Sequence, residues 1–212
     1  MADVLRLASR DAADVEEIWT RYVPSARVQN LDPKPFGFQW CSVSLGGMSI
    51  VRYALTATVD SAVQPEDQLF ACRVTTPNGW VRSGRSHLDT SVPWATDGAQ
   101  VEAHWEGTAD VSALVFDRAE AQRLARRITG DDLLRLRLTD AVPRDRTAGR
   151  HWNRAFDYLL SASAAAGDDP LIESSLVRHA LLTTLSTFRS TFFDAAVRDA
   201  GGGAPREALE RR

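Results

Sequence analysis

Apolar and polar residues alternate through much of the first half of the chain, which is the pattern of β-strands with one buried face. The apolar, β-branched and aromatic residues gather in short runs bounded by Gly, Pro, Asn and Asp. These runs lie at 38–45, 48–59, 68–76, 80–82, 86–92, 100–105 and 111–116. About seven strands at a spacing of roughly ten residues predict a β-sandwich or a barrel.

Two other features precede these strands. The stretch Asp14–Tyr22 carries Val15, Ile18, Trp19 and Tyr22 at helical spacing, which predicts a short amphipathic helix. The segment 31–37 is rich in proline and glycine, and we expect it to be a turn that leads into the first strand.

After residue 116 the apolar spacing becomes helical. Asp117, with Glu120 three positions later, forms a capping-box pattern, and Gly130 stands where a helix usually ends. These signals predict a helix between Asp117 and Gly130. A last strand is expected at Leu133–Leu138.

Two longer helices are predicted towards the end of the chain. The first covers Thr147–Ala165, and the second begins at Asp169 with Pro170 in its first turn and continues to Arg198. The apolar stripe of the second helix is broader than one packing contact requires, which indicates a dimer interface. The alternative is a helix buried within its own domain. The residues assigned to the interface are Val177, Leu181, Thr184 and Phe188.

Charge and composition exclude several functions. The chain of 212 residues has a net charge of −3, whereas a surface that grips nucleic acid is usually basic. Lys34, the single lysine, lies between two prolines and so fits neither a P-loop nor a Schiff-base site. No apolar run approaches the ~18 residues of a membrane span, and the N-terminus lacks a secretory signal pattern. We therefore expect a cytoplasmic protein that does not contact membranes.

The histidines do not indicate a metal site. His87, His104, His151 and His179 show none of the close spacings, such as HxH, that metal ligands usually have. His104 and Glu106 share a strand face, but solvent-facing polar residues explain that arrangement equally well. We expect no metal, no cofactor and no catalytic residue. Cys41 and Cys72 are expected to be small core residues.

Aromatic residues are unusually dense in the strand region, where Trp40, Tyr53, Trp80, Trp94 and Trp105 all fall. Such side chains line small-molecule pockets in barrels, although packing in the core is the simpler explanation for any one of them. Arg73 lies on the strand face of Leu69 and Ala71, where it either pairs with an anionic ligand or faces solvent. The candidate ligand-binding residues are Trp40, Tyr53, Arg73, Trp80, His87 and Trp105.

Several segments, in this order, resemble the N-terminal sensing domain of AraC/XylS-type transcriptional regulators, the subgroup with a cupin-like AraC-binding domain. They are DQLFACRVTTPNGWVRSG, LDTSVPWATDG, SALVFDRAEAQRLARRITG, GRHWNRAFDYLL and LIESSLVRHALLTTL. The likeness covers Phe36 to Phe193, and the order of the segments carries it more than any single motif.

The resemblance implies an α+β fold, in which a cupin-like antiparallel β-barrel of jelly-roll type is followed by a helical dimerisation subdomain. It implies a sensing domain at 1–140, a helical dimerisation region at 141–200 and a linker at 201–212. In complete members a C-terminal helix-turn-helix domain binds DNA. We therefore expect a homodimeric regulatory domain that senses a small-molecule effector, is not an enzyme, and contacts DNA only through that further domain. The alternatives are a cupin-type metal-dependent enzyme and a free-standing binding protein.

Overall fold

The computed structural model describes residues 3–165 and 169–202, the last four of them by their backbone only. Its strands and helices follow in the order β1 (Asp3–Ser9), α1 (Ala13–Tyr22), β2 (Arg27–Leu45), β3 (Met48–Val63), β4 (Gln68–Thr75), β5 (Asn78–Ser83), β6 (Ser86–Leu88), β7 (Trp94–Thr96), β8 (Val101–Asp117), α2 (Arg118–Thr129), β9 (Leu138–Pro143), α3 (Arg146–Ala165), α4 (Pro170–Thr187), β10 (Phe188–Ser190) and α5 (Thr191–Gly202). The α+β class expected from the sequence is confirmed.

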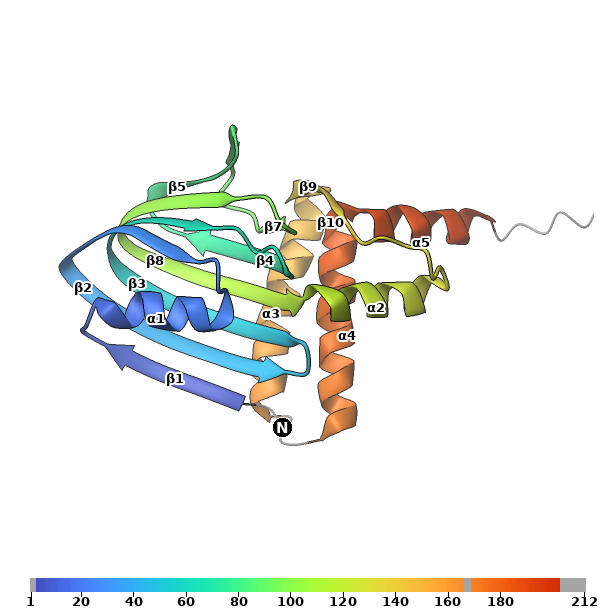
Figure 1. Ribbon diagram of the computed structural model, residues 1–212, viewed down its shortest axis with the longest axis horizontal. Helices are drawn as coiled ribbons and strands as arrows, with labels where there is room; N and C mark the ends of the chain where they lie inside the picture. The colour runs from blue at the N-terminus through green and yellow to red at the C-terminus, as the bar shows by residue number, and fades with distance from the viewer. Residues whose placement is uncertain (1–2, 166–168, 203–212) are drawn as a thin grey trace, which may run out of the picture.

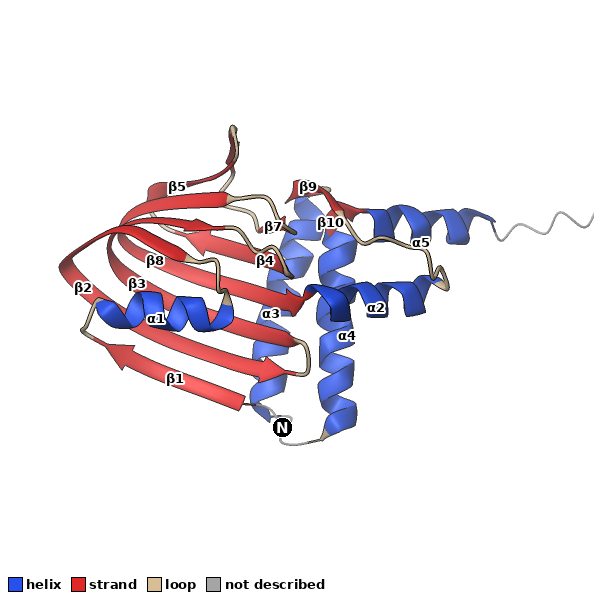
Figure 2. Ribbon diagram, in the orientation of Figure 1, coloured by secondary structure: helices blue, strands red, loops and turns tan. Residues whose placement is uncertain are grey.

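One strongly curved antiparallel sheet forms the first part of the molecule (Figure 1). Its strands lie in the order β1-β2-β3-β8-β4-β7, and β5 pairs with β8 and β6. The long strands β2, β3 and β8 form its centre. Helices α2 to α5 gather at one end of the sheet, whereas α1 lies among the strands (Figure 2).

The two faces of the sheet bury two separate apolar cores. On β4, Phe70, Cys72 and Val74 contribute to the inner core, while Leu69 and Ala71 contribute to the outer core. This division follows from the two-residue period of a strand, which sends neighbouring side chains to opposite faces. Helix α1 packs on the inner core, and α2 to α5 pack on the outer core.

The helical part shares its core with the sheet. The outer core joins Ile50 and Leu114 of the strands to Trp152, Phe156 and other residues of the helices. The outer core therefore contains residues from both sides of the boundary proposed at residue 140, namely from the strands before it and from the helices after it. Helix α5 continues through Gly202, which is two residues into the predicted linker, and the rest of that linker lies outside the described residues.

Several predicted elements match the structure closely. The short N-terminal helix is α1, and the helix expected after Asp117 is α2. The carboxylate of Asp117 accepts a hydrogen bond from the backbone N–H of Glu120, and Gly130 adopts the left-handed conformation expected of a C-terminal cap. The carboxylate of Asp169 likewise accepts from the backbone at Leu171 and Ile172 at the start of α4.

The strand predictions need several corrections. Strands β1, β7 and β10 have no counterpart among the predicted runs, and the run at 86–92 forms a strand, β6, only from Ser86 to Leu88. The segment 31–37 is not a separate turn but part of β2, where a bulge between Asp32 and Gly37 accommodates the prolines. The runs at 100–105 and 111–116 are one strand, β8. The strand expected at Leu133–Leu138 is β9, which covers Leu138–Pro143 and overlaps the prediction only at Leu138.

The single helix predicted from Asp169 to Arg198 is wrong, because β10 divides it into α4 and α5. Phe188 is extended, and Phe188 and Ser190 pair with β9. The apolar pattern does not reveal this break, since Phe188 and Phe192 are both buried in the outer core. None of the described helices combines the length and the apolar character that crossing a membrane requires.

Candidate ligand-binding cavity

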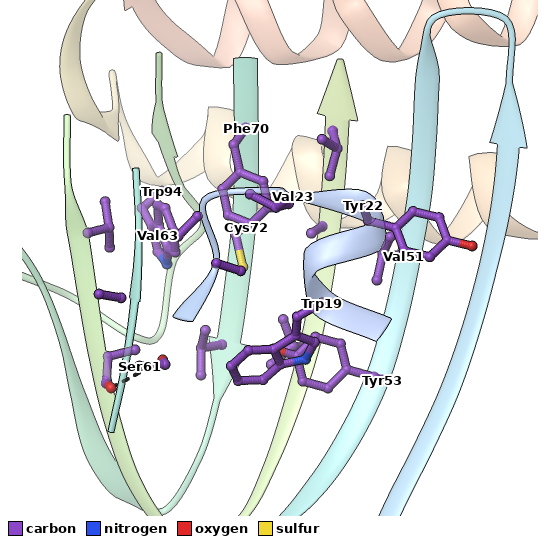
Figure 3. Close-up of a pocket in the computed structure, with 18 of the residues that line it drawn as sticks. Trp19, Tyr22, Val23, Val51, Tyr53, Ser61, Val63, Phe70, Cys72 and Trp94 are labelled. Atoms are coloured by element: carbon purple, nitrogen blue, oxygen red, sulfur yellow. Dashed lines mark hydrogen bonds between the residues drawn. The ribbon is translucent and has the colours of Figure 1, made fainter. Parts of the chain in front are cut away.

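A cavity lies within the inner core, between α1 and the concave face of the sheet (Figure 3). Its volume is about 80 Å³, several times the ~10–15 Å³ that one water molecule needs. Its wall is largely apolar and aromatic. The aromatic side chains on it are Trp19, Tyr22, Trp40, Tyr53, Phe70, Trp94 and Trp105.

Strand alternation explains how the sheet supplies this wall. On β3, Val51, Tyr53, Ser61 and Val63 line the cavity at the two-residue period of a strand, and Ala62 joins them near the end of the strand. Helix α1 and the turn after it close the remaining side with Trp19, Tyr22, Val23 and Ala26. The cavity is therefore assembled from segments that are far apart in the sequence.

Aromatic rings contact one another around the cavity. The rings of Trp40 and Tyr53 are stacked, with centroids 5.2 Å apart, and Trp19 lies 5.7 Å from Tyr53 and 6.2 Å from Trp105. Across the cavity, Phe70 and Trp94 lie 5.4 Å apart. Such packed rings form rigid walls, because each side chain is held by its neighbours.

The wall carries no carboxylate and no basic side chain among the described residues. Its titratable groups are the phenols of Tyr22 and Tyr53 and the thiol of Cys72. Burial raises the pKa of the Cys72 thiol. The pKa of Tyr53 is also raised, mainly by burial and to a smaller extent by the nearby Cys72. The Cys72 and Tyr53 groups therefore stay uncharged at neutral pH.

Hydrogen bonds account for only part of the polar wall. The indole N–H of Trp40 donates to the Ser42 hydroxyl at 2.9 Å, and that hydroxyl donates to the Tyr22 oxygen at 2.6 Å. By contrast, the indole nitrogens of Trp19, Trp94 and Trp105 are buried and have no hydrogen-bond partner within the described part of the chain. Buried donors are normally paired, so three unpaired ones around a single cavity require an explanation.

The structure places three of the six candidate ligand-binding residues on this cavity. Trp40, Tyr53 and Trp105 line it together, although they come from three different strands. Arg73 does not line the cavity, because it follows Cys72 on β4 and points to the opposite face, where its guanidinium donates to the Thr75 hydroxyl.

Trp80 and His87 are also outside the cavity. Trp80 precedes Val81, whose side chain fills the inner core, so the Trp80 ring faces outward and stacks on His104 at 5.9 Å. His87 is exposed and lies at 6.3 Å from the same ring. Trp80, His87 and Arg73 therefore lie outside this cavity, and their assignment as ligand-binding residues stays a prediction.

Several cavity residues were missed by the sequence prediction. The helical spacing of Trp19 and Tyr22 indicated a buried face but not that this face closes a cavity. Phe70 and Cys72 follow from the same alternation that removes Arg73, since they occupy the opposite face of β4, and Trp94 of β7 is the pairing partner of Cys72. The face of β4 that lines the cavity is the one that α1 covers, and the position of α1 cannot be inferred from the residue pattern of β4 alone.

The predicted dimer-interface residues belong to the outer core. Leu181, Thr184 and Phe188 are at most 1% exposed, and the Thr184 hydroxyl accepts a hydrogen bond from the indole of the equally buried Trp152. Val177 is half-buried and packs against the same core. These side chains contact the chain's own helices and strands, so the alternative of a helix buried within its domain describes them.

The histidines do not converge on one centre. His104 pairs with Asp60 at 2.7 Å, and its other ring nitrogen lies 3.8 Å from Glu106. Among residues 3–165 and 169–202, no three His, Cys, Asp or Glu side chains gather in a way that could hold a metal ion.

Comparisons with known proteins identify the fold. No family model matches the sequence, and no curated protein sequence matches it. Among solved structures, the AraC-like transcriptional activator CuxR is similar over 98% of this chain and 73% of its own, at 14% identity and a TM-score of 0.50. Ectoine synthase from P. lautus and the Schizosaccharomyces pombe Cnp3 cupin domain match 41% and 44% of the chain, at 11% and 9% identity and TM-scores of 0.32 and 0.33. These two matches cover 70% and 73% of their own chains. The chain therefore has the fold of an AraC-like activator, as the sequence resemblance implied.

Proposed function

We propose that this chain is the ligand-sensing regulatory domain of an AraC-like transcriptional regulator and that it catalyses no reaction. The observation that carries this proposal is an aromatic cavity in the inner core of a chain with the fold of an AraC-like activator. An internal cavity with rigid walls and few polar groups is typical of a small-molecule site. In this proposal the DNA contact belongs to a helix-turn-helix domain C-terminal to the described residues, and the regulator acts in the cytoplasm.

A continuous set of contacts supports communication from the cavity to the helices. Trp94 lies on the cavity wall, and Asp97 follows it by three residues. The Asp97 carboxylate accepts a hydrogen bond from the backbone N–H of Leu138 at 3.1 Å and pairs with Arg118 at the start of α2. A ligand that moves Trp94 would thereby shift the positions of α2 and β9.

The contacts continue from β9 to α5. The backbone N–H of Thr191, at the start of α5, donates to the Arg137 carbonyl, and the Thr191 hydroxyl accepts from the Arg137 N–H and donates to the Arg135 carbonyl, just before β9. Helix α5 is the last element described before the C-terminal end. We propose that occupancy of the cavity changes the orientation of α5, which passes the signal to the DNA-binding domain.

A homodimer is part of this proposal, with its interface on the outer face of the α3–α4 hairpin. Tyr158, Leu171 and Ile172 line one groove there and are 59%, 76% and 44% exposed. These three make up half of the large apolar side chains that the described structure exposes. A second copy that covers them would remove this apolar surface from water.

Sedimentation of the purified chain tests the interface. We expect a dimer at tens of micromolar, and we expect a Tyr158→Ser/Leu171→Ser double variant to be a monomer with an unchanged circular dichroism spectrum. Leu133→Ser is the matched control, since Leu133 is 88% exposed but lies in a loop away from α3 and α4. A wild-type chain that sediments as a monomer, or a double variant that remains a dimer, would show that this interface is wrong.

Hydrogen exchange tests the sensing role. A thermal-shift screen of metabolites would identify a ligand, because binding to the folded state raises the apparent stability. That ligand should slow exchange at the cavity and change exchange at 134–138 and 188–191. A ligand that alters the cavity alone would instead support a free-standing binding protein. Stoichiometric transition metal in the purified protein, with turnover of a bound substrate, would support the cupin-type enzyme.

A further inference from the structure

Three tryptophans on the cavity wall have unpaired indole N–H groups, and these groups indicate the chemistry of a ligand that would fit the cavity. Trp19 comes from α1, Trp94 from β7 and Trp105 from β8, so the three side chains that carry these donors meet at the cavity wall from separate elements. Trp19 is 8% exposed, Trp94 3% and Trp105 1%, which leaves bulk water little access to them. An indole N–H only donates, so each of these groups is complemented by a hydrogen-bond acceptor.

The charge of the wall excludes an ionic ligand. No Arg, Lys, His, Asp or Glu side chain lines the cavity, and the pKa values of Tyr53 and Cys72 are both raised by burial. Moving a carboxylate, phosphate or ammonium group from water into such surroundings costs far more free energy than neutral hydrogen bonds return. A ligand that enters this cavity is therefore uncharged.

The shape and polarity of the wall favour a ring. The stacked pair of Trp40 and Tyr53 and the tilted pair of Phe70 and Trp94 present flat aromatic surfaces around the cavity. A polyol would need acceptors for several hydroxyl donors, whereas the only side-chain hydroxyls among the described lining residues are those of Ser61, which donates to the Ala103 carbonyl, Tyr22 and Tyr53. A wall with unpaired donors and few free acceptors selects a ligand rich in acceptors and poor in donors.

We propose that the cavity binds a compact, uncharged ring compound whose carbonyl or ether oxygens accept hydrogen bonds from the indoles of Trp19, Trp94 and Trp105. Lactones, quinones and aromatic ketones belong to this class. The inference rests on the proposed function in using the same cavity, and it adds the chemical class of the effector. The indole N–H groups donate hydrogen bonds to the ligand oxygens, and the aromatic side chains of the wall pack against the ligand ring.

Nuclear magnetic resonance of the indole N–H groups tests this proposal directly. The chain has six tryptophans, so a ¹⁵N-labelled sample gives six indole signals that single Trp→Phe variants assign. The probes are three matched sets: coumarin and acetophenone, naphthalene and ethylbenzene without an acceptor oxygen, and the charged coumarin-3-carboxylate and benzoate. The signals of Trp80, outside the cavity, and Trp152, already bonded to Thr184, are internal controls.

We expect the carbonyl compounds to shift the signals of Trp19, Trp94 and Trp105 in a saturable manner while Trp80 and Trp152 stay in place. The hydrocarbons should bind at least threefold more weakly, and the carboxylates at least tenfold more weakly. Trp94→Phe removes the N–H and keeps a smaller aromatic ring, so it should weaken carbonyl binding by about three- to tenfold relative to any change in hydrocarbon binding, which measures the effect of ring size alone. Trp80→Phe should change neither.

Two results would overturn the ligand class. Hydrocarbons that bind as tightly as the carbonyl compounds would show that the indole donors contribute nothing, and a preference for the carboxylates would contradict the uncharged cavity. In both cases the cavity still binds a ligand, so the sensing role would survive. If no probe moves a cavity signal but a charged metabolite from the thermal-shift screen does, the class is again wrong. Cavity signals that respond to no compound at all would contradict the proposed function as well.

Discussion

Arg118 and Asp97 connect the first helix after the sheet to the turn that follows β7. The Arg118 guanidinium donates to the backbone carbonyl oxygen of Asp97 and, at 3.1 Å, to its carboxylate. The same carboxylate accepts the backbone N–H of Leu138. Both side chains are about one-fifth exposed, so the pair is partly shielded from water. One carboxylate thus holds together α2, the cavity-side turn and the start of β9.

Removing this carboxylate should destabilise the protein measurably. We expect Asp97→Ala to lower the free energy of unfolding by about 1–3 kcal/mol, because it leaves a partly buried guanidinium and a backbone N–H without their acceptor. Urea denaturation followed by fluorescence measures the change. The control is Asp157→Ala, which removes an exposed partner of Arg52 and should cost about 1 kcal/mol or less. Equal losses in the two variants would contradict the structural role of Asp97.

Trp152 is central to the outer core. It is fully buried, stacks on Phe156 at 5.6 Å and donates to Thr184. Trp152→Ala should lower the free energy of unfolding by about 3–5 kcal/mol, because it removes a large buried ring and leaves a cavity. Trp80→Ala removes a half-buried ring outside the cores, which contacts His104 and Arg82, and should cost only about 1 kcal/mol. Chemical denaturation of both variants makes the comparison, and a mild effect at Trp152 would argue against the packing of α3 on α4.

Ser190 separates α4 from α5. Its hydroxyl accepts a hydrogen bond from the backbone N–H of Phe193 at 3.2 Å and donates to the Leu185 carbonyl. Ser190→Ala should therefore cost about 1–2 kcal/mol of stability, which is the usual effect of losing a helix N-cap. Ser174→Ala is the control, since this exposed serine bonds only within its own helix and should be close to neutral. If Ser190→Ala were equally neutral, the capped junction between α4 and α5 would be incorrect.

Cys72 should be inert towards thiol reagents in the folded protein. Burial raises the pKa of this thiol, so it stays protonated between pH 7 and 9, where an ordinary cysteine increasingly becomes the reactive thiolate. Its position on the cavity wall also limits access. Colorimetric titration with a disulfide reagent should find the half-buried Cys41 first and Cys72 only after denaturation. A Cys41→Ser variant that reacts quickly at pH 8 would show that the cavity is open to solvent.

Much of the fold was predictable from local patterns. The alternation in 48–59 and 68–76 corresponds to β3 and β4, and the cap residues Asp117, Gly130 and Asp169 correctly mark helix ends. These features depend on the conformational preferences of residues a few positions apart, which the sequence contains directly. Trp40, Tyr53 and Trp105 could be chosen because large aromatics in strands are informative by residue type alone.

Only the tertiary structure decided which face of each strand lines the cavity. Strand alternation states that Arg73 and Cys72 point to opposite sides, but it does not state which side α1 covers. The break at Phe188 was equally hidden, because pairing with β9 creates it and the apolar spacing continues through it. The stripe at Leu181 and Thr184 showed that this surface is buried, while the identity of its partner depended on long-range packing. The local sequence thus determined the elements and their apolar faces, and contacts between distant segments determined what each face meets.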